Sequence, residues 1–522
     1  MSYMKKQRNV FIFVLLFTFF IVAFFYRFYG LTVNNPPFWV DEFASANQAK
    51  FFLEHGLGAF SLPDTYIEHY NITTHILMAL SYKLFGVNEF AARFPSVLIG
   101  SLIPVVVFII SQQLFKFGTA ISATLLTIFS YFQIVWSRKA RGYIILQFII
   151  LASLYLYIRL LGKKDRLTFI LFLLMLFFGI ITHPFYYVFL VAIISHSLLM
   201  NAKNISKIIR NVWTYLIGIA VFLIALKIGF IQSFILLTKL GSFGTNNLWY
   251  YHSFLWREYG LIAFLALIGF AVMIAGKEKK LLVIPIYLGL HLFFVSFIFK
   301  PYVSRYLLPV FPYFLIAASF TITQLAHRVI SRSNSDSRRI FAILILTLFI
   351  IGNGYKFVTK PKKYYSLNHD FREISNIDYH SIYALVKNKG AIINKKFVMI
   401  DTWYDRGRWY LGDNFENIYI FRWFREAGTV NGLSQKTNYD HNKEGEKILA
   451  GSSLRLVLET SDLMKLMKKY SAGFLLIDDI SLPKDVRDFA EENLKKELYL
   501  DHYPLDDNPY SIWPVTLYSW GI

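Results

Sequence analysis

Two adjacent carboxylates, Asp41 and Glu42, stand in the stretch "NNPPFWVDEFASANQ", just after an almost purely apolar run. A carboxylate at such a position can act as a general base toward a hydroxyl group, or it can bind a cation. The pair can also simply begin a helix, because acidic side chains are stabilised near a helix N-terminus. Residues 1–359 contain only 10 acidic residues, and two of them are adjacent here. This scarcity favours a chemical role for the pair.

Arginines in two short motifs form a second group of candidates. The stretch "WSRKARGY" (136–143) carries Arg138 and Arg141, and "KPYVSRYLLPVFPYF" (300–314) carries Arg305. The donor fork of an arginine suits a phosphate group, and an arginine at the edge of hydrocarbon needs a partner. The alternatives are basic side chains that reach from helix ends to water, and prolines that merely kink a helix. A lipid phosphate would suit both motifs.

Histidines near these motifs are weaker candidates. His183 lies in the turn "THPFYY", and His69 and His75 lie in "EHYNITTHIL". A single histidine in a turn is more often structural than catalytic, so each is kept only as a candidate for an acceptor or donor site. The chain has no cysteine, which excludes disulfides and cysteine-bound metals.

The composition indicates that these residues belong to a protein that spans a membrane. Of the 522 residues, 56% are hydrophobic and 52 are Phe, with a mean hydropathy of +0.45. Apolar runs near the length of a membrane span recur over the first two thirds, so we expect a polytopic α-helical membrane protein. The eleven predicted spans are 10–29, 93–113, 118–136, 143–161, 167–182, 184–200, 211–231, 260–276, 281–299, 305–326 and 340–357.

The distribution of charge predicts the orientation of these spans. From Lys360 to the end there are 23 basic and 23 acidic residues, so residues 1–359 hold the whole net charge of +21. Basic residues concentrate in the alternate loops that share a side with the N-terminus, which predicts a cytoplasmic N-terminus and an extracytoplasmic C-terminus in the cell membrane. Nucleic acid is not an expected partner, because the polar C-terminal region carries no basic patch.

The remaining segments divide the chain into two domains. We expect residues 1–359 to form the transmembrane domain, in which 34–92 is an outer loop. Amphipathic helices at 41–56 and 71–86 are expected to lie in the interface there. Residues 360–522 are expected to form a soluble extracytoplasmic α/β domain, because short apolar runs such as "KKFVMIDTWY" and "AGFLLIDDIS" alternate with amphipathic stretches.

The ordered motifs resemble a known family. An acidic pair opens the first loop, and "LFGVNEFAARFPSVLIGSL", "SRKARGY", "THPFYY" and "SRYLLPVFP" follow it. This order resembles the GT-C superfamily of membrane glycosyltransferases. The nearest likeness is to the prokaryotic relatives, within glycosyltransferase family 39, of protein O-mannosyltransferases and aminoarabinose transferases. The resemblance covers residues 10–320.

The resemblance implies an activity and roles for the candidates. Such enzymes move a sugar from a polyprenyl-phosphate carrier to an acceptor at the outer face, with inversion of the anomeric centre. Asp41 would be the base that deprotonates the acceptor hydroxyl, and Glu42 would orient Asp41 or the acceptor. The carrier phosphate would be held by residues of the two basic motifs: Arg138, Arg141, Tyr143, Arg305 and Tyr306.

One departure leaves the acceptor open. Many relatives have a His-Pro-Pro or Lys-Pro-Pro-Leu stretch where this sequence reads "EHYNITTHIL". His69, Asn71 and His75 are the candidates to replace it. Oligosaccharyltransferases of the same superfamily use a divalent cation, but no His/Asp cluster here indicates a metal site. No cofactor is therefore predicted, and a divalent cation stays an open alternative.

Two other function classes remain as alternatives. A polytopic lipid or glycan transporter, such as a flippase, would typically show repeat symmetry and midplane breaks, and the sequence shows neither. A non-catalytic scaffold would bind envelope glycans through residues 360–522 and would not need Asp41. The leading prediction is an inverting glycosyltransferase whose acceptor is a protein, a lipid or an envelope glycan.

Overall fold

The computed structural model covers most of the chain. It describes residues 2–33, 35–56, 71–162, 165–200, 223, 245–329, 336–367, 373–393, 397–412, 416–420, 439–449, 455–478 and 484–522. The predicted span 211–231 and the candidate His69 lie outside the described residues, Leu223 excepted.

The chain folds into two compact units. The helical unit comprises Met1–Tyr29, Glu68–Leu77 and Arg93–Lys362. The mixed unit comprises Gly30–Ile67, Met78–Ala92 and Lys363–Ile522. The mixed unit thus joins most of the first loop to the C-terminal residues, and each unit is described by itself.

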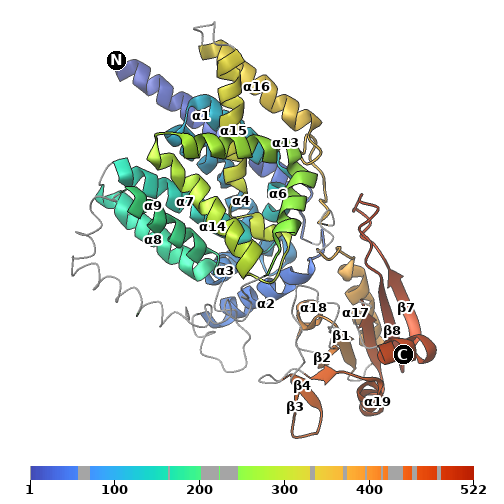
Figure 1. Cartoon of the computed structure of the whole chain (residues 1–522). Coiled ribbons are helices and arrows are strands. Elements are labelled where there is room, and N and C mark those ends of the chain that lie inside the picture. Colours follow the sequence, from blue (N-terminus) through green and yellow to red (C-terminus); the bar gives the residue numbers. More distant parts are fainter. Residues whose placement is uncertain are drawn as a thin grey trace. The chain divides into compact units, whose positions relative to one another are not determined.

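Helices at the predicted positions build the helical unit (Figure 1, blue to yellow). They are α1 (Ser2–Phe28), α4 (Glu89–Leu114, whose first four residues belong to the mixed unit), α5 (Phe117–Phe129), α6 (Tyr131–Ser137), α7 (Tyr143–Gly162), α8 (Arg166–Thr182), α9 (Tyr186–Met200), α13 (Leu248–Ala275), α14 (Val283–Phe293), α15 (Phe311–Val329) and α16 (Asp336–Asn353). Short helices η3 (Lys279–Leu282), η4 (Phe294–Ile298) and η5 (Ser304–Leu307) connect some of them.

Several of these helices suit a membrane. In the described part of the chain, five segments are long and apolar enough to cross one: Val10–Phe28, Glu89–Leu114, Tyr143–Gly162, Leu248–Ala275 and Lys279–Ile298. α5, α8 and α9 are shorter apolar helices. α15 and α16 form where two further spans are predicted, although their composition alone does not mark them as spans. The prediction of a polytopic helical membrane protein is confirmed.

One predicted span is divided. The sequence predicts a single helix over 118–136, but α5 ends before Ser130 and α6 starts after it. Ser130 has an extended backbone, and its side chain accepts a hydrogen bond from the Gln133 amide at 3.5 Å. The Tyr259 hydroxyl accepts a hydrogen bond from the backbone amide of Phe132 at 3.1 Å. Tyr259 itself has non-helical backbone angles within α13. The interruption is thus capped by side chains, which the apolar pattern did not indicate.

The mixed unit contains a six-stranded sheet in its C-terminal part (Figure 1, orange to red). Its order is β5 (Leu456–Val457), β2 (Glu416–Ile420), β1 (Val398–Asp401), β6 (Gly473–Ile477), β8 (Val515–Trp520), β7 (Lys495–Leu500). The first four strands are parallel, and the last two pairings are antiparallel. A separate hairpin joins β3 (Tyr439–His441) to β4 (Lys447–Leu449).

Helices accompany this sheet and the first loop. α17 (Tyr379–Ile393), α18 (Tyr404–Leu411), α19 (Thr460–Lys469) and α20 (Lys484–Asn493) come from the C-terminal region, and α2 (Val40–His55) from the first loop. α3 (Ile72–Phe85) has residues in both units. The helices α2 and α3 form where amphipathic helices are predicted, and neither is among the apolar helices suited to span a membrane.

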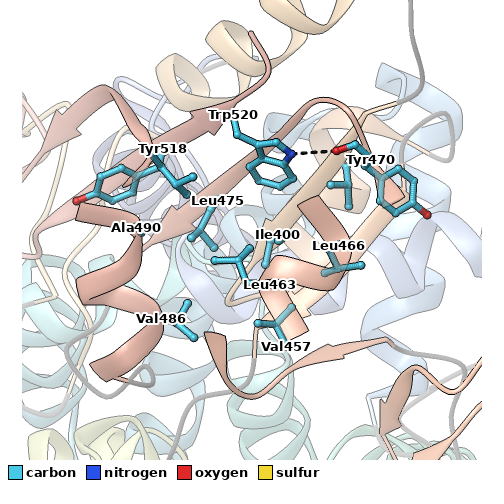
Figure 2. Close-up of a cluster of buried hydrophobic side chains, with 12 residues drawn as sticks. Ile400, Val457, Leu463, Leu466, Tyr470, Leu475, Val486, Ala490, Tyr518 and Trp520 are labelled. Atoms are coloured by element: carbon cyan, nitrogen blue, oxygen red, sulfur yellow. Dashed lines mark hydrogen bonds between the residues drawn. The ribbon is translucent and has the colours of Figure 1, made fainter. Parts of the chain in front are cut away.

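A hydrophobic core supports the sheet. Ile400 of β1 pairs with Ile418 and Leu475 in the neighbouring strands. Buried Leu463 and Leu466 of α19, and Val486 and Ala490 of α20, pack with the strand residues in one cluster (Figure 2). Burial of each leucine or valine side chain in this cluster contributes about 1.5–3 kcal/mol. The C-terminal region therefore has its own core, as the predicted α/β domain requires.

Candidate functional site

The two acids differ in their surroundings within the mixed unit. Both lie in the first turn of α2. The Glu42 side chain is fully buried, and its Oε2 accepts a hydrogen bond from the backbone amide of Trp39 at 2.8 Å. Asp41 is partly exposed. Glu42 therefore caps the helix, whereas Asp41 presents the more accessible carboxylate of the pair.

Residues of the C-terminal region hold the segment that precedes Asp41 and Glu42. The Trp39 indole donates a hydrogen bond to the Ile374 carbonyl at 2.9 Å, and the side-chain amide of Asn376 donates one to the Pro37 carbonyl at 3.0 Å. The Phe38 ring is fully buried, and its centroid lies 5.1 Å from that of Trp409. Contacts with the C-terminal region thus hold the "PPFWV" segment in place.

The helix α2 is held along its length by the same region. The Asn47 side chain donates to the Asp405 carbonyl at 2.7 Å, and the Phe43 ring packs edge-on against Tyr379 and Tyr410. Glu89, in the "LFGVNEF" motif, accepts from the Tyr410 hydroxyl at 2.7 Å and lies 3.0 Å from His380 Nε2. Two motifs of the first loop are therefore anchored by α17 and α18.

In the helical unit, Arg305 lies among aromatic rings. Its guanidinium carbon is 5.9 Å from the centroids of Trp136 and Tyr143 and 5.8 Å from that of Tyr306. These are distances of cation–π attraction. His291 Nε2 donates to the Tyr306 carbonyl at 2.7 Å and steadies that residue. Residues of both basic motifs, Tyr143 from the first and Tyr306 from the second, thus lie around the Arg305 guanidinium.

Arg138 holds the end of the first helix. Its Nη1 donates to the carbonyls of Tyr29 at 2.6 Å and Arg27 at 3.2 Å. Arg27 is fully buried and donates through Nε to Ser137 at 3.2 Å. Carbonyls at a helix C-terminus have no partner within the helix, so a nearby cation satisfies them. The geometry gives Arg138 a structural role and leaves Arg141 and Arg305 as the stronger phosphate candidates.

The loop that carries Arg141 makes a close backbone contact. A Cβ atom on Gly142 would lie 2.4 Å from Asn71 Oδ1 and 2.8 Å from Thr74 Oγ1. Asn71 has a φ of 72°, and its amide donates to the Thr182 carbonyl at 3.0 Å. The segments around Arg141, Asn71 and the "THPFYY" turn therefore meet, and the missing side chain of Gly142 allows the approach.

The histidines beside this loop are held neutral. Burial first, and then the charge of Arg141, lower the pKa of His75 to about 3. Burial, Arg141, His291 and Arg305 lower the pKa of His183 to about 3. His183 Nδ1 accepts a hydrogen bond from the Phe185 amide at 3.2 Å. An uncharged imidazole in this cluster leaves the positive charge on the arginines.

The structure thus gathers most of the predicted residues into two groups. Asp41 and Glu42 belong to the mixed unit. The helical unit gathers seven residues besides Arg138: Asn71, His75, Arg141, Tyr143, His183, Arg305 and Tyr306. Sequence reasoning missed Arg27, Trp136 and His291. The interruption of "FIVAFFYRFYG" by a single arginine was a signal for the first of these.

A metal site is not formed by the part of the chain that the structure describes. No three His, Asp or Glu side chains gather there with the geometry of metal ligands.

Comparisons with known proteins concern the family and the fold of the chain. Residues 72–228 match the family of dolichyl-phosphate-mannose-protein mannosyltransferases. ArnT from Cupriavidus metallidurans, solved with bound undecaprenyl phosphate, is 12% identical with a TM-score of 0.57, and the match covers 98% of each chain. An Archaeoglobus fulgidus oligosaccharyltransferase is 11% identical with a TM-score of 0.51, over 93% of this chain and 72% of that one. Among curated protein sequences, none matches. At these identities the structural likeness shows the fold, and the fold implied by the resemblance is confirmed.

Proposed function

We propose that this chain, a multi-pass membrane protein with the fold of the GT-C glycosyltransferases, transfers a sugar from a polyprenyl-phosphate carrier to an acceptor hydroxyl. The match of residues 72–228 to a mannosyltransferase family and the fold shared with two transferases support the activity. The observation that carries the proposal is the position of Arg305 among three aromatic rings, together with the charges of Arg141 and Arg305 that both act on His183. It offers fixed positive charge next to apolar surface, as a lipid-linked phosphate requires.

The transfer is a single displacement. The acceptor oxygen forms a bond to the anomeric carbon while the bond from that carbon to the carrier phosphate oxygen breaks. Asp41 takes the proton of the acceptor hydroxyl, and the carrier leaves as its phosphate. Arg141 and Arg305 stabilise the charge that develops on the leaving oxygen. One displacement inverts the anomeric centre and needs no covalent intermediate on the enzyme.

Glu42 acts as a positioning residue in this mechanism. Its buried carboxylate accepts a hydrogen bond from the backbone amide of Trp39, the residue just before the helix. Glu42 therefore fixes the first turn, which carries Asp41. The acceptor is a protein, a lipid or an envelope glycan at the outer face of the cell membrane, with the N-terminus cytoplasmic. The charge distribution of the loops supports this orientation.

The test is turnover of a radiolabelled polyprenyl-phosphate sugar by purified protein, with host membranes as the acceptor source. Wild type is expected to transfer label, and Asp41→Asn is expected to lose at least a hundredfold in rate while it still binds carrier lipid. Arg305→Gln is expected to weaken carrier binding about tenfold. Glu278→Gln, which changes an acid with a 62% exposed side chain, is the matched control and should leave turnover unchanged.

Equal transfer by wild type and Asp41→Asn would show that the acidic pair only begins the helix and takes no part in catalysis. Carrier binding without transfer by any variant would refute the transferase and point to lipid transport.

A further inference from the structure

The mixed unit contains a polar pocket remote in sequence from the acids and arginines above. Its volume is about 250 Å³, and it lies between the β3–β4 hairpin and α19. Side chains of both charges line it, including Glu446, Lys447, Arg455, Asp462, Lys465 and Lys469. The volume is a little below the roughly 300–1,000 Å³ typical of pockets for drug-sized molecules, so it suits a small ligand or one ring of a longer one.

The floor of this pocket belongs to the domain core. Leu456 and Leu466 line it and are 4% and 7% exposed. Leu466 packs in the cluster with Val457, Leu463 and Tyr470 (Figure 2). The wall that bears Arg455 is joined to the hairpin by a β-bridge between Ile448 and Arg455. The polar groups therefore stand on a fixed base.

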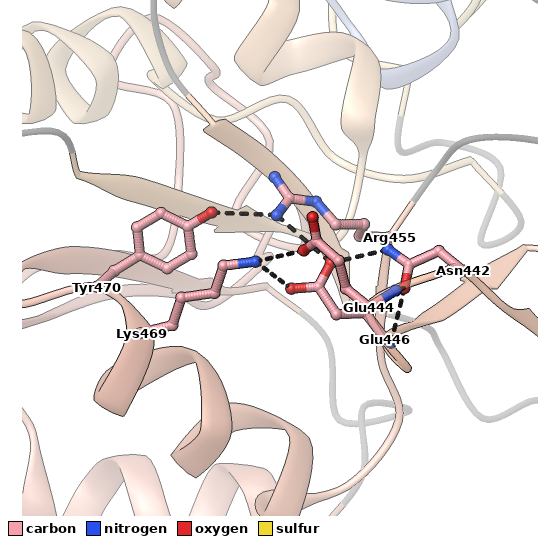
Figure 3. Close-up of polar contacts among 6 residues, drawn as sticks. All are labelled: Asn442, Glu444, Glu446, Arg455, Lys469 and Tyr470. Atoms are coloured by element: carbon pink, nitrogen blue, oxygen red, sulfur yellow. Dashed lines mark hydrogen bonds and ion pairs between the residues drawn. The ribbon is translucent and has the colours of Figure 1, made fainter.

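Ion pairs hold the polar groups in place. Lys469 Nζ lies 2.8 Å from Glu444 and 2.7 Å from Glu446 (Figure 3). Arg455 Nη1 lies 3.7 Å from Glu446 and donates to the Tyr470 hydroxyl at 3.1 Å. Across the pocket, Lys447 Nζ lies 2.7 Å from Glu459 and 3.0 Å from Asp462. The pocket thus has both hydrogen-bond donors and acceptors, and ion pairs already hold them in position.

This arrangement favours an uncharged ligand over an anion. A phosphate or carboxylate would compete with carboxylates that already pair Lys447, Arg455 and Lys469. A hydroxyl group can donate to a carboxylate and accept from an ammonium without breaking either pair. A ligand with several hydroxyls would therefore meet groups that are already oriented, which lowers the entropic cost of binding.

We propose that this pocket binds a neutral saccharide unit of the acceptor, so that the C-terminal region selects a glycan-bearing acceptor. The inference rests on the proposed function in one respect, because the saccharide is part of an acceptor only if the chain is a glycosyltransferase. Lys465, whose exposed side chain makes no ion pair among the described residues, supplies a donor at the rim.

The first experiment measures saccharide binding to the full-length protein in detergent by saturation-transfer NMR. The probes are methyl glycosides of glucose, galactose, mannose and N-acetylglucosamine, with inorganic phosphate as the anionic probe. At least one glycoside should bind wild type in the millimolar range. Glu446→Gln and Lys465→Ala should each weaken it threefold or more. Lys468→Ala changes an exposed lysine of the same helix that does not line the pocket, and it should bind like wild type.

Kinetics separate this inference from the proposed function. Lys465→Ala should raise KM for the acceptor at least threefold with kcat unchanged. Asp41→Asn should lose transfer and still bind the glycoside. Glycoside binding together with full transfer by Asp41→Asn would overturn the proposed base but keep the pocket. No glycoside binding, equal binding by Lys465→Ala and Lys468→Ala, or displacement of the glycoside by phosphate would overturn the pocket.

Discussion

At the scale of single residues, the acidic pair shows how two neighbouring carboxylates can have separate tasks. Glu42 is buried against the backbone of Trp39, and Asp41 is partly exposed. The sequence indicated that the pair mattered and that helix capping was the alternative. It did not indicate that one residue is the cap and the other is accessible. That depends on which side of the helix is covered by the C-terminal region, whose contacts join residues 335 and 358 positions apart in the chain.

The stability of variants tests this division. Glu42→Ala removes the acceptor for the Trp39 amide and leaves a buried space, so we expect a loss of about 1–2 kcal/mol in the free energy of unfolding. Asp41→Asn keeps the shape of a partly exposed side chain and should change stability by less than about 0.5 kcal/mol. Thermal unfolding in detergent measures both. A larger loss for Asp41→Asn than for Glu42→Ala would contradict the assignment.

The lowered pKa of His183, in the "THPFYY" turn, leads us to expect that the stability of the protein depends on pH. The pKa of His183 falls from 6.5 to about 3 on folding, so below pH 6.5 the unfolded chain binds a proton that the folded chain does not. Stability is therefore complete above pH 6.5 and declines as the pH falls toward 3. At pH 5 the loss is about 2 kcal/mol.

The measurement compares wild type and His183→Gln in thermal unfolding at pH 7.5 and pH 5. The variant should lose less stability on acidification than wild type does. The same substitution at His502, whose side chain is 62% exposed, controls for the removal of a histidine as such. Equal losses for wild type and His183→Gln would show that the turn does not exclude the proton.

At the scale of elements, the apolar pattern predicted where helices form but not where they are interrupted. The division at Ser130 depends on a hydroxyl from α13, which lies more than a hundred residues away in the chain. The meeting of Gly142 with Asn71 likewise depends on how loops pack. Contacts of this kind are not encoded in local periodicity, so the grouping of Arg141 with His75 could be expected only from the predicted common side of the membrane.

A glycine substitution tests the contact between these loops. Gly142→Ala would place Cβ 2.4 Å from Asn71 Oδ1, so we expect a loss of about 1–3 kcal/mol in stability and weaker carrier binding. Asn71→Gly should relieve part of this loss in the double variant, because glycine readily adopts the φ of 72° found there. Gly162→Ala has open space around its Cβ and serves as the control. Strict additivity of Gly142→Ala and Asn71→Gly would argue against the contact.

At the scale of the whole molecule, the sequence predicted a helical membrane part and a C-terminal α/β region, and the fold agrees. The order of the sheet, with two antiparallel strands at one edge, was beyond sequence reasoning because strand pairing is set by distant contacts. The grouping of the first loop with the C-terminal residues was also unexpected. Charge density marked residue 360 as a boundary, but it carried no information on what the C-terminal region packs against.

Hydrogen exchange tests that grouping. Trp409→Ala removes a ring that lies 5.1 Å from Phe38 and 6.4 Å from Tyr82, measured between ring centroids. Amides of α2 should then exchange at least tenfold faster, which corresponds to about 1.4 kcal/mol. Ile512→Ala, a change at a residue that is 58% exposed in the same unit, should have no such effect. Unchanged exchange in α2 of the Trp409→Ala variant would refute the dependence of this helix on α18.

The bond from Trp39 to Ile374 joins residues 335 positions apart in the chain. Translation adds about 5–20 residues per second, so the ribosome delivers the partner of this tryptophan roughly 20–70 s after the tryptophan itself. During that interval the nascent chain has its acidic pair but lacks the support that orients it. Full order of the pair therefore comes only after the segment around Ile374 has been made, which would keep shorter nascent chains from acting on carrier lipid during their own insertion.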